Sequence, residues 1–275
     1  GLMVIMGAGL VSFGHGLYFG LGGYGAALGS ILLGVSDAFI LVLLGVMASS
    51  SVAFLLGFMM ARYRGIFFAL LNLAFSMLFF GLLVNSASLG STDGFSIPAP
   101  SYLGYVPSVA ETRVTFVLYS MICILTYLSA IAVHRYFSST MGYIGDAIRE
   151  NEVRIEYLGA SVRQSIMIKY VISAVLAGMG GALTVLLIGH VTPEDTVYWT
   201  RSGEFVFVAI LSGTGHVVAP FLGSAVFELV RTYALQYAPD VWQMLLGATL
   251  LLVIMFLPSG IWSLIQKIVR PRLKT

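Results

Sequence analysis

Five stretches of this sequence, each of about 20 residues, carry at most one charged residue, and this feature constrains the fold more than any other. A helix of that length spans the hydrocarbon core of a bilayer, whereas a helix on the surface of a soluble protein needs a polar face. The stretches are residues 38–61, 66–86, 114–134, 166–189 and 241–262. The sequence therefore predicts an all-α chain, a polytopic bundle of transmembrane helices.

Composition excludes two classes of protein. Of the 275 residues, 59% are hydrophobic and 9% are charged, whereas about 25% of the residues of a soluble domain are charged. The formal net charge of +2 is too small for a nucleic-acid-binding surface. We therefore expect a lipid bilayer around the chain, no nucleic-acid partner and no soluble-enzyme fold. The lone Cys123 excludes a disulfide framework.

Two further apolar segments, residues 1–34 and 205–235, are each interrupted by a glycine-rich stretch with a histidine. Interrupted helices in corresponding halves of a chain are a pointer to a transport pathway, because unwound backbone is tolerated only where it is buried in protein or lines a cavity. The alternatives are close helix packing for the glycines and hydrogen bonds between helices for the polar residues. The candidate pathway residues are Ser12, Gly14, His15, Gly16, Asn72, Ser212, Gly213, Gly215 and His216.

Basic residues gather on one side of the predicted spans. Eleven of the 14 Lys and Arg residues lie within residues 62–64, 135–169 and 267–274. Because short basic loops stay on the cytoplasmic side, we expect these loops and the C-terminus in the cytoplasm. The loop of residues 89–113, with Asp93 and Gly94 in a turn, then faces outward, although turn chemistry alone explains its composition.

This orientation has two consequences for the number of crossings. The loops alternate correctly only if residues 205–235 cross the membrane twice, the first crossing being short. The sequence opens inside an apolar stretch at Gly1 without a signal-peptide pattern, so we expect at least one further transmembrane helix upstream. We take residues 1–275 as a single transmembrane domain.

Residues 141–164 form a long charged stretch between two spans, on the predicted cytoplasmic side. Residues 146–158 predict one helix that begins near Asp146 and stops at Gly159, with Glu150 and Arg154 spaced for an i,i+4 ion pair. Its apolar residues fall near one stripe, which contains Ile144, Ile148, Ile155 and Leu158. An apolar ridge beside charges suits docking into a cleft on a soluble partner, and the alternative is a helix lying on lipid headgroups.

Several catalytic signatures are missing from the sequence. It contains no Gly-x-x-x-x-Gly-Lys-Ser/Thr phosphate loop, no cysteine and histidine spacing for zinc and no Gly-x-Ser-x-Gly elbow. Glu228 is the only acidic residue inside a plausible span. A proton-driven carrier needs more carboxylates within the membrane than this. We expect no catalytic residue, metal or cofactor in this chain, and energy that enters from another subunit.

The order of these motifs resembles one family, the membrane permeases of branched-chain amino acid ABC importers and their relatives for urea, short amides and aromatic acids. The resemblance rests on residues 12–24, 64–69, 91–94, 147–152, 156–159 and 212–216. Ser212 departs from the Gly-Gly-x-Gly of many members, which leaves its own role open. Of the two permease types in these importers, the sequence looks more like the one with the longer outward loop.

The resemblance implies an assembly in a bacterial inner membrane. Its other members are a second homologous permease, two ATPase subunits that bind ATP and magnesium, and an extracytoplasmic solute-binding protein. In this family the charged stretch docks into the ATPase, which implies a coupling role for Asp146, Ile148, Arg149, Glu150, Asn151, Glu152, Ile155, Leu158 and Gly159. Replacing Ile148 or Leu158 with aspartate is then expected to abolish uptake and leave the protein inserted.

Two other functions fit parts of the sequence. A passive channel or facilitator for a small solute such as urea uses the same interrupted helices, but it gives the charged stretch no task. A noncatalytic membrane anchor predicts no solute pathway at all. Copurification with an ATPase through residues 141–164 favours the importer.

Overall fold

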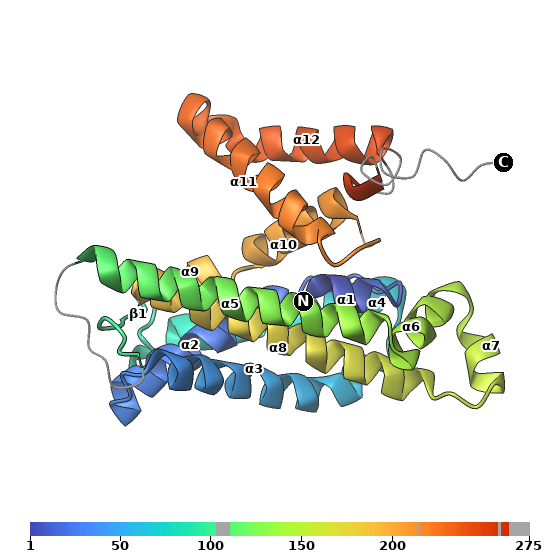
Figure 1. Cartoon of the computed structure of the whole chain (residues 1–275), viewed down its shortest axis with the longest axis horizontal. Helices are drawn as coiled ribbons and strands as arrows, with labels where there is room; N and C mark the ends of the chain where they lie inside the picture. The colour runs from blue at the N-terminus through green and yellow to red at the C-terminus, as the bar shows by residue number, and fades with distance from the viewer. Residues whose placement is uncertain (103–110, 214, 258–259, 264–275) are drawn as a thin grey trace. The chain divides into compact units, whose positions relative to one another are not determined.

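The protein is an all-α chain, seen here in a computed structural model that describes residues 1–102, 111–213, 215–257 and 260–263, with the backbone alone for 111–115 (Figure 1). The fold class predicted from the sequence is confirmed. The chain folds as two compact units, Gly1–Ser202 and Gly203–Thr275. The single domain predicted over residues 1–275 stays a prediction.

The first unit holds most of the secondary structure. Its elements are α1 (Leu2–Met6), α2 (His15–Leu33), α3 (Ala38–Met60), α4 (Gly65–Asn85), η1 (Ala87–Leu89), β1 (Phe95–Ser96), α5 (Glu111–Phe137), α6 (Thr140–Glu150), α7 (Glu152–Tyr157), α8 (Val162–Ile188), β2 (His190–Val191) and α9 (Pro193–Thr196). Helix α10 (Trp199–Ser212) begins in the first unit and continues into the second. The second unit adds α11 (Ala219–Tyr237), η2 (Pro239–Val241) and α12 (Trp242–Phe256).

Local chemistry sets the ends of the long helices. The Asp37 carboxylate caps α3, because its Oδ1 accepts hydrogen bonds from the amides of Phe39 and Ile40 at 2.9 and 3.3 Å. Helix α8 begins after Ser161, whose hydroxyl accepts from the amide of Gln164 at 3.3 Å. Both caps are polar residues directly before an apolar run, so they mark where each membrane-spanning helix begins.

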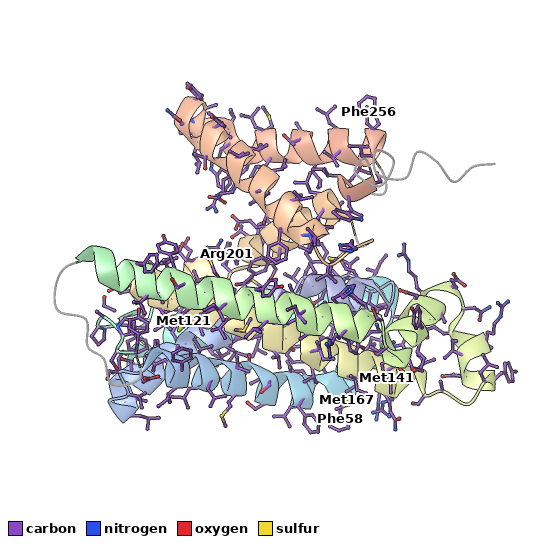
Figure 2. The ribbon with its side chains drawn as sticks, in the orientation of Figure 1. Phe58, Met121, Met141, Met167, Arg201 and Phe256 are labelled. Atoms are coloured by element: carbon purple, nitrogen blue, oxygen red, sulfur yellow. The ribbon has the colours of Figure 1, made fainter. Side chains whose placement is uncertain are left out.

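Six helices are long and apolar enough to cross a membrane among the residues that the structure describes. They are α2, α3, α4, residues Phe116–Phe137 of α5, α8, and Pro239–Phe256. Large apolar side chains point away from the protein, such as Phe58 on α3 and Phe256 on α12, which are 47% and 70% exposed (Figure 2). Lipid is the solvent that such a surface requires, so the chain is a multi-pass membrane protein.

The five uninterrupted spans predicted from the sequence are confirmed as α3, α4, α5, α8 and α12. Both interrupted segments are also confirmed, since α1 and α2 divide residues 1–34, and α10 and α11 divide residues 205–235. Neither α10 nor α11 is among the six candidate spans, so the two crossings expected there stay a prediction.

Helices α2, α3 and α8 form the centre of the first unit, and glycines bring their backbones close together. A Cβ built on Gly22 of α2 would lie 1.9 Å from the carbonyl oxygen of Gly178 on α8. A Cβ on Gly45 of α3 would lie 2.4 Å from the carbonyl oxygen of Gly22. These glycines permit close packing, which is the alternative that the sequence left open for glycines in apolar helices.

The two loops with predicted functions lie at opposite ends of the first unit. Figure 1 shows α6 and α7 beside the start of α8, and β1 at the far end of the same helix. There β1 pairs antiparallel with β2, Phe95 facing Val191 and Ser96 facing His190. The predicted outward loop is thus attached to the end of α8, a helix length away from residues 141–164.

Candidate functional site

The first interruption, between α1 and α2, lies in a buried polar cluster. His15, the first residue of α2, is 3% exposed, and its Nε2 is 2.6 Å from the hydroxyl oxygen of Ser173 on α8. That hydroxyl donates to the carbonyl of Gly1 at 2.8 Å, so it accepts from His15. The contact fixes α2 to α8 at the predicted pathway.

Three buried side chains, which we call the tyrosine network, connect α2, α4 and α8. The hydroxyl of Tyr18 on α2 donates to that of Tyr170 on α8, which donates to Asn72 Oδ1 on α4, each at 2.5 Å. Asn72 Nδ2 in turn donates to the Phe68 carbonyl at 2.8 Å. Asn72, predicted as a pathway residue, therefore lies in a hydrogen-bonded junction of three helices.

The glycines of the first interruption allow close approach and free their amides. A Cβ on Gly14 would lie 2.8 Å from the backbone oxygen of Asn72, so only glycine fits there. The Gly14 amide donates to the buried Ser12 hydroxyl at 3.2 Å, and the Gly16 amide donates to the Ser202 hydroxyl at 2.8 Å. Hydroxyl groups thus satisfy amides that the interrupted helix leaves without carbonyl partners.

The structure brings together the five candidate residues of this half, Ser12, Gly14, His15, Gly16 and Asn72, and adds Tyr18, Tyr170, Ser173 and Ser202. The four added residues were not predicted from the sequence. A signal was present, since Tyr170 and Ser173 are three residues apart on α8 and so lie on one face. In a helix that is apolar all round, that signal does not say which face is internal.

Tyr170→Phe is expected to lower the free energy of unfolding by about 1–3 kcal/mol for each group left unpaired, here the Asn72 carbonyl oxygen and the Tyr18 hydroxyl. Thermal unfolding of the purified protein measures the loss. The matched control is Tyr127→Phe on α5, where the ring is 68% exposed and the change should be small. Equal Tm values for the two variants would contradict the energetic role of the network.

The second interruption, between α10 and α11, is packed within the second unit. Gly213 has φ +80°, the left-handed region, and a Cβ on Gly260 would lie 2.4 Å from its amide nitrogen. The ring of His216 stacks on Trp262 at 4.6 Å between centroids, and its Nδ1 accepts from the Val218 amide at 3.2 Å. Ser212 is buried and donates to the Ala209 carbonyl at 3.0 Å, whereas Gly215 is exposed.

The charged stretch contains two helices, so the single helix predicted over residues 146–158 is wrong. Helix α6 begins at Thr140, ahead of Asp146, and the chain breaks at Asn151, whose side chain caps α7 by accepting from the Arg154 amide at 3.0 Å. Glu150 and Arg154 therefore do not share a helix, and the predicted i,i+4 geometry is lost. Gly159 ends α7 with φ +84°, as predicted.

The predicted apolar ridge is also wrong, because two of its side chains face the interior of the chain and not the solvent. Ile148 and Ile155 are 2% and 8% exposed, so they pack inside this chain and are not available to a partner. Leu158 is 77% exposed, next to Tyr157 at 88% and near Val153 at 60%. We call these three exposed residues, Val153, Tyr157 and Leu158, the α7 apolar face. Asp146, Arg149 and Glu150 are exposed as well.

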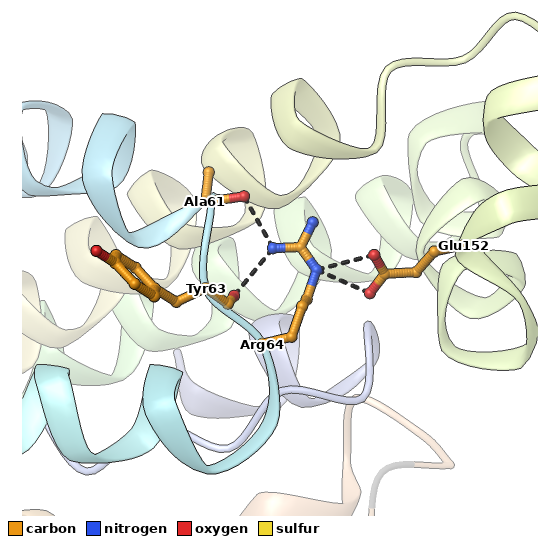
Figure 3. Close-up of polar contacts among 4 residues, drawn as sticks. All are labelled: Ala61, Tyr63, Arg64 and Glu152. Atoms are coloured by element: carbon orange, nitrogen blue, oxygen red, sulfur yellow. Dashed lines mark hydrogen bonds and ion pairs between the residues drawn. The ribbon is translucent and has the colours of Figure 1, made fainter.

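An ion pair ties α7 to the turn between α3 and α4 (Figure 3). Arg64 Nε donates to both oxygens of Glu152 at 2.8 and 2.9 Å. Arg64 Nη1 donates to the carbonyls of Ala61 and Tyr63 at 2.8 and 2.9 Å. Because Arg64 is the residue before α4, the ion pair connects the charged stretch to the helix that carries Asn72.

The ion pair predicts unequal effects of removing its two ends. Glu152→Ala should cost less than about 1 kcal/mol, because both side chains are partly exposed and water screens their charges. Arg64→Ala should cost about 1 kcal/mol more than Glu152→Ala, because it also removes the donor to the partly buried Ala61 carbonyl, whereas water reaches the exposed Tyr63 carbonyl. Thermal unfolding measures both, with the exposed neighbour Arg62→Ala as control. Equal losses for the three variants would contradict the carbonyl contacts.

The predicted outward loop is fixed at Gly94, where φ is +69° and a Cβ would lie 1.8 Å from the Val191 carbonyl oxygen. Asp93 is exposed. The later part of this predicted loop, residues 103–110, lies outside the described residues. Among the described residues, no three His, Cys, Asp or Glu side chains are grouped as a metal site requires.

Comparison with known proteins gives consistent matches along the chain. The profile of the family described as "Branched-chain amino acid transport system / permease component" matches residues 1–254. The high-affinity branched-chain amino acid transport system permease protein LivM of Escherichia coli (strain K12) is 29% identical over all of this chain and 68% of its own length. LivM of Salmonella typhimurium is also 29% identical, again over the whole chain and 68% of that protein.

A second kind of permease protein is more distantly similar. LivH of Escherichia coli (strain K12), also named as a permease protein of a high-affinity branched-chain amino acid transport system, is 24% identical over 92% of this chain and 85% of its own length. No solved structure matches the chain significantly.

Proposed function

The chain belongs to the family of permease components of branched-chain amino acid transport systems, and from that premise we propose that it forms part of the solute pathway of an ATP-driven importer. As a permease subunit it is not itself an enzyme. The proposed solute is a branched-chain amino acid or a related small polar molecule. The proposed partners are a second, homologous permease, two ATPase subunits that bind ATP and magnesium, and an extracytoplasmic solute-binding protein.

The observation that carries this proposal is the form of the charged stretch. Helices α6 and α7 lie at one end of the first unit, and the α7 apolar face stands in solvent-accessible positions beside Arg154 and Glu156 (Figure 1). Exposed apolar residues between charges are typical of a surface that another protein covers. A passive channel has no use for such a surface.

The proposed orientation follows from charge. Arg64, Arg149, Arg154 and Arg163 all belong to the end of the first unit that carries α6 and α7. By the positive-inside rule that end, together with the C-terminus, faces the cytoplasm of a bacterial inner membrane. The outward loop with Asp93 and Gly94 then faces the solute-binding protein.

The proposed pathway passes the first interruption. His15 and Ser173, and the tyrosine network, join α2, α4 and α8 by hydrogen bonds between buried groups. A polar solute that replaced these partners would keep the groups satisfied, which is a condition for moving polar molecules through a bilayer. Alternating access requires these bonds to separate when the ATPase subunits close.

The test is uptake by proteoliposomes that contain the complete complex. Leucine uptake that needs ATP and the binding protein, and that leucine analogues suppress, is the expected result. Urea and an aromatic acid serve as competitors that identify the other solute classes of the family. Solute entry that is equally fast without ATP would overturn the importer in favour of a passive channel.

A further inference from the structure

Lys169 on α8 is a buried cation without a hydrogen-bonding partner. Its side chain is 0% exposed, and its ammonium makes no hydrogen bond to any described residue. The ammonium lies 5.1 Å from the ring centroid of Tyr136 and 6.0 Å from that of Phe137. Asp146 is the acidic group whose charge acts on it, but Asp146 is exposed, so water screens this attraction.

A glycine on α6 makes the burial of Lys169 possible. A Cβ built on Gly145 would lie 2.1 Å from Lys169 Nζ and 2.2 Å from Cε, so the ammonium occupies the space of the missing side chain. Helix α6 packs against α8 at this point. We call Gly145, Tyr136 and Phe137 the lysine seat.

The buried position is unfavourable for a lysine. Near the end of a span, a lysine normally extends its ammonium to the headgroups and water. Lys169 is the eighth residue of α8, close enough to the helix start to do so, yet α6 covers it. The rings of Tyr136 and Phe137 compensate for part of the hydration energy that the ammonium loses, but not for all of it. Separation of α6 from α8 would rehydrate the ammonium, so the charge favours separation.

The residues that follow Lys169 hold the candidate pathway. Tyr170 is the central member of the tyrosine network, and Ser173, one turn further, binds His15. A change in the contact between α6 and α8 at Lys169 therefore acts on the helix segment that joins α2 and α4.

We propose that Lys169 is a positioning residue that keeps the contact between α6 and α8 readily separable, so that movement of α6 by the partner ATPase opens the lysine seat during transport. The inference rests on the proposed function of the chain as the permease of an ATP-driven importer. A lysine with a purely structural role would stabilise the resting protein. Lys169 instead lowers its stability, which allows α6 to move.

Lys169→Met tests this inference, because methionine fills a similar volume without charge. Replacing a buried ion with an apolar side chain commonly stabilises a protein, so the Tm of the complex should rise by about 2–8 °C. Uptake should fall by roughly tenfold, since a helix contact stabilised by the corresponding energy separates about ten times less often. The control Ile168→Met, at an exposed position of α8, should change neither quantity.

Amine footprinting tests the opening of the seat in the unmodified chain. The sequence has three lysines, Lys169, Lys267 and Lys274, so peptide mapping distinguishes modification of Lys169 from that of the other two. A water-soluble amine reagent should leave Lys169 unmodified in the nucleotide-free complex and modify it when the ATPase is trapped with ATP. Gly145→Ala, whose methyl group displaces the ammonium, should allow modification without ATP.

The outcomes separate this inference from the proposed function. If the parent complex shows no ATP-dependent uptake, the proposed function fails. If the parent transports and Lys169→Met transports equally, or loses Tm together with uptake, only the inference about Lys169 is overturned. Protection of Lys169 in the ATP-trapped complex would overturn it as well.

Discussion

Leu158→Asp is expected to abolish ATP-driven uptake, with a loss of more than about tenfold, while the chain still folds and inserts. Leu158 is 77% exposed, so a carboxylate there stays in water and costs the folded chain little. In the proposed complex the same position lies against the ATPase, where an unpaired buried charge weakens association. Uptake and copurification of the ATPase with the variant complex measure the loss.

The matched control is Leu158→Met, which keeps an apolar side chain of similar volume and should retain uptake. If Leu158→Asp transports as well as the parent, then the α7 apolar face is not the docking surface. If neither variant supports uptake, the position requires leucine itself, and an apolar contact alone does not describe its role.

Ile148→Asp no longer tests docking. Ile148 is 2% exposed, so the aspartate would be buried within the chain at a cost of several kcal/mol and would disrupt α6. Limited proteolysis of residues 141–164 should be faster in this variant than in Leu158→Asp. Ile148 and Leu158 had the same predicted role because a helical stripe shows which side chains are apolar but does not show what covers them.

The spans were predictable because their physics is local. The observed α3, Ala38–Met60, agrees with the predicted 38–61, and α4, Gly65–Asn85, agrees with 66–86. A bilayer fixes the minimum length of an apolar run, and a capping residue such as Asp37 fixes where the helix begins. Neither condition depends on contacts between distant parts of the chain.

The break at Asn151 was not predicted, although the sequence contains its signal. Asn151 is a favoured N-cap residue and Glu152 is an acidic residue at the first position of α7, a pattern typical of a helix start. The charges on both sides suggested one continuous amphipathic helix. The ion pair between Glu152 and Arg64 stabilises the break, and its partners are separated by 88 residues.

Only part of the candidate site was predicted, because some of its residues have a local signal and others depend on contacts between distant segments. The glycine and histidine of the first interruption are visible in the sequence because they break an apolar pattern. Tyr170 and Lys169 are polar members of an apolar helix, and whether they face lipid, water or protein depends on the packing of α2, α4 and α6 around α8. That packing follows from contacts between distant segments, which periodicity does not report.

Gly181→Ala is expected to destabilise the protein by about 3 kcal/mol, the upper end of the usual cost of overpacking, and it tests the close contact of α2 and α8 on which the candidate site depends. A Cβ on Gly181 would lie 1.8 Å from the carbonyl oxygen of Phe19 and 2.7 Å from its carbonyl carbon. Both are backbone atoms, so no side-chain rotation relieves the clash and the two helices must move apart.

The adjacent glycine provides the control. A Cβ on Gly180 would lie 3.8 Å from the Phe19 ring, which is ordinary van der Waals contact, and alanine has the higher helix propensity. Gly180→Ala should therefore leave Tm unchanged or slightly raised, whereas Gly181→Ala lowers it; equal Tm values would contradict the backbone contact. Because α2 carries His15 and Tyr18, and α8 carries Ser173 and Tyr170, separation of these helices would also break both hydrogen-bonded links. Uptake should then fall with Tm in Gly181→Ala, in contrast to Lys169→Met, where uptake falls as Tm rises.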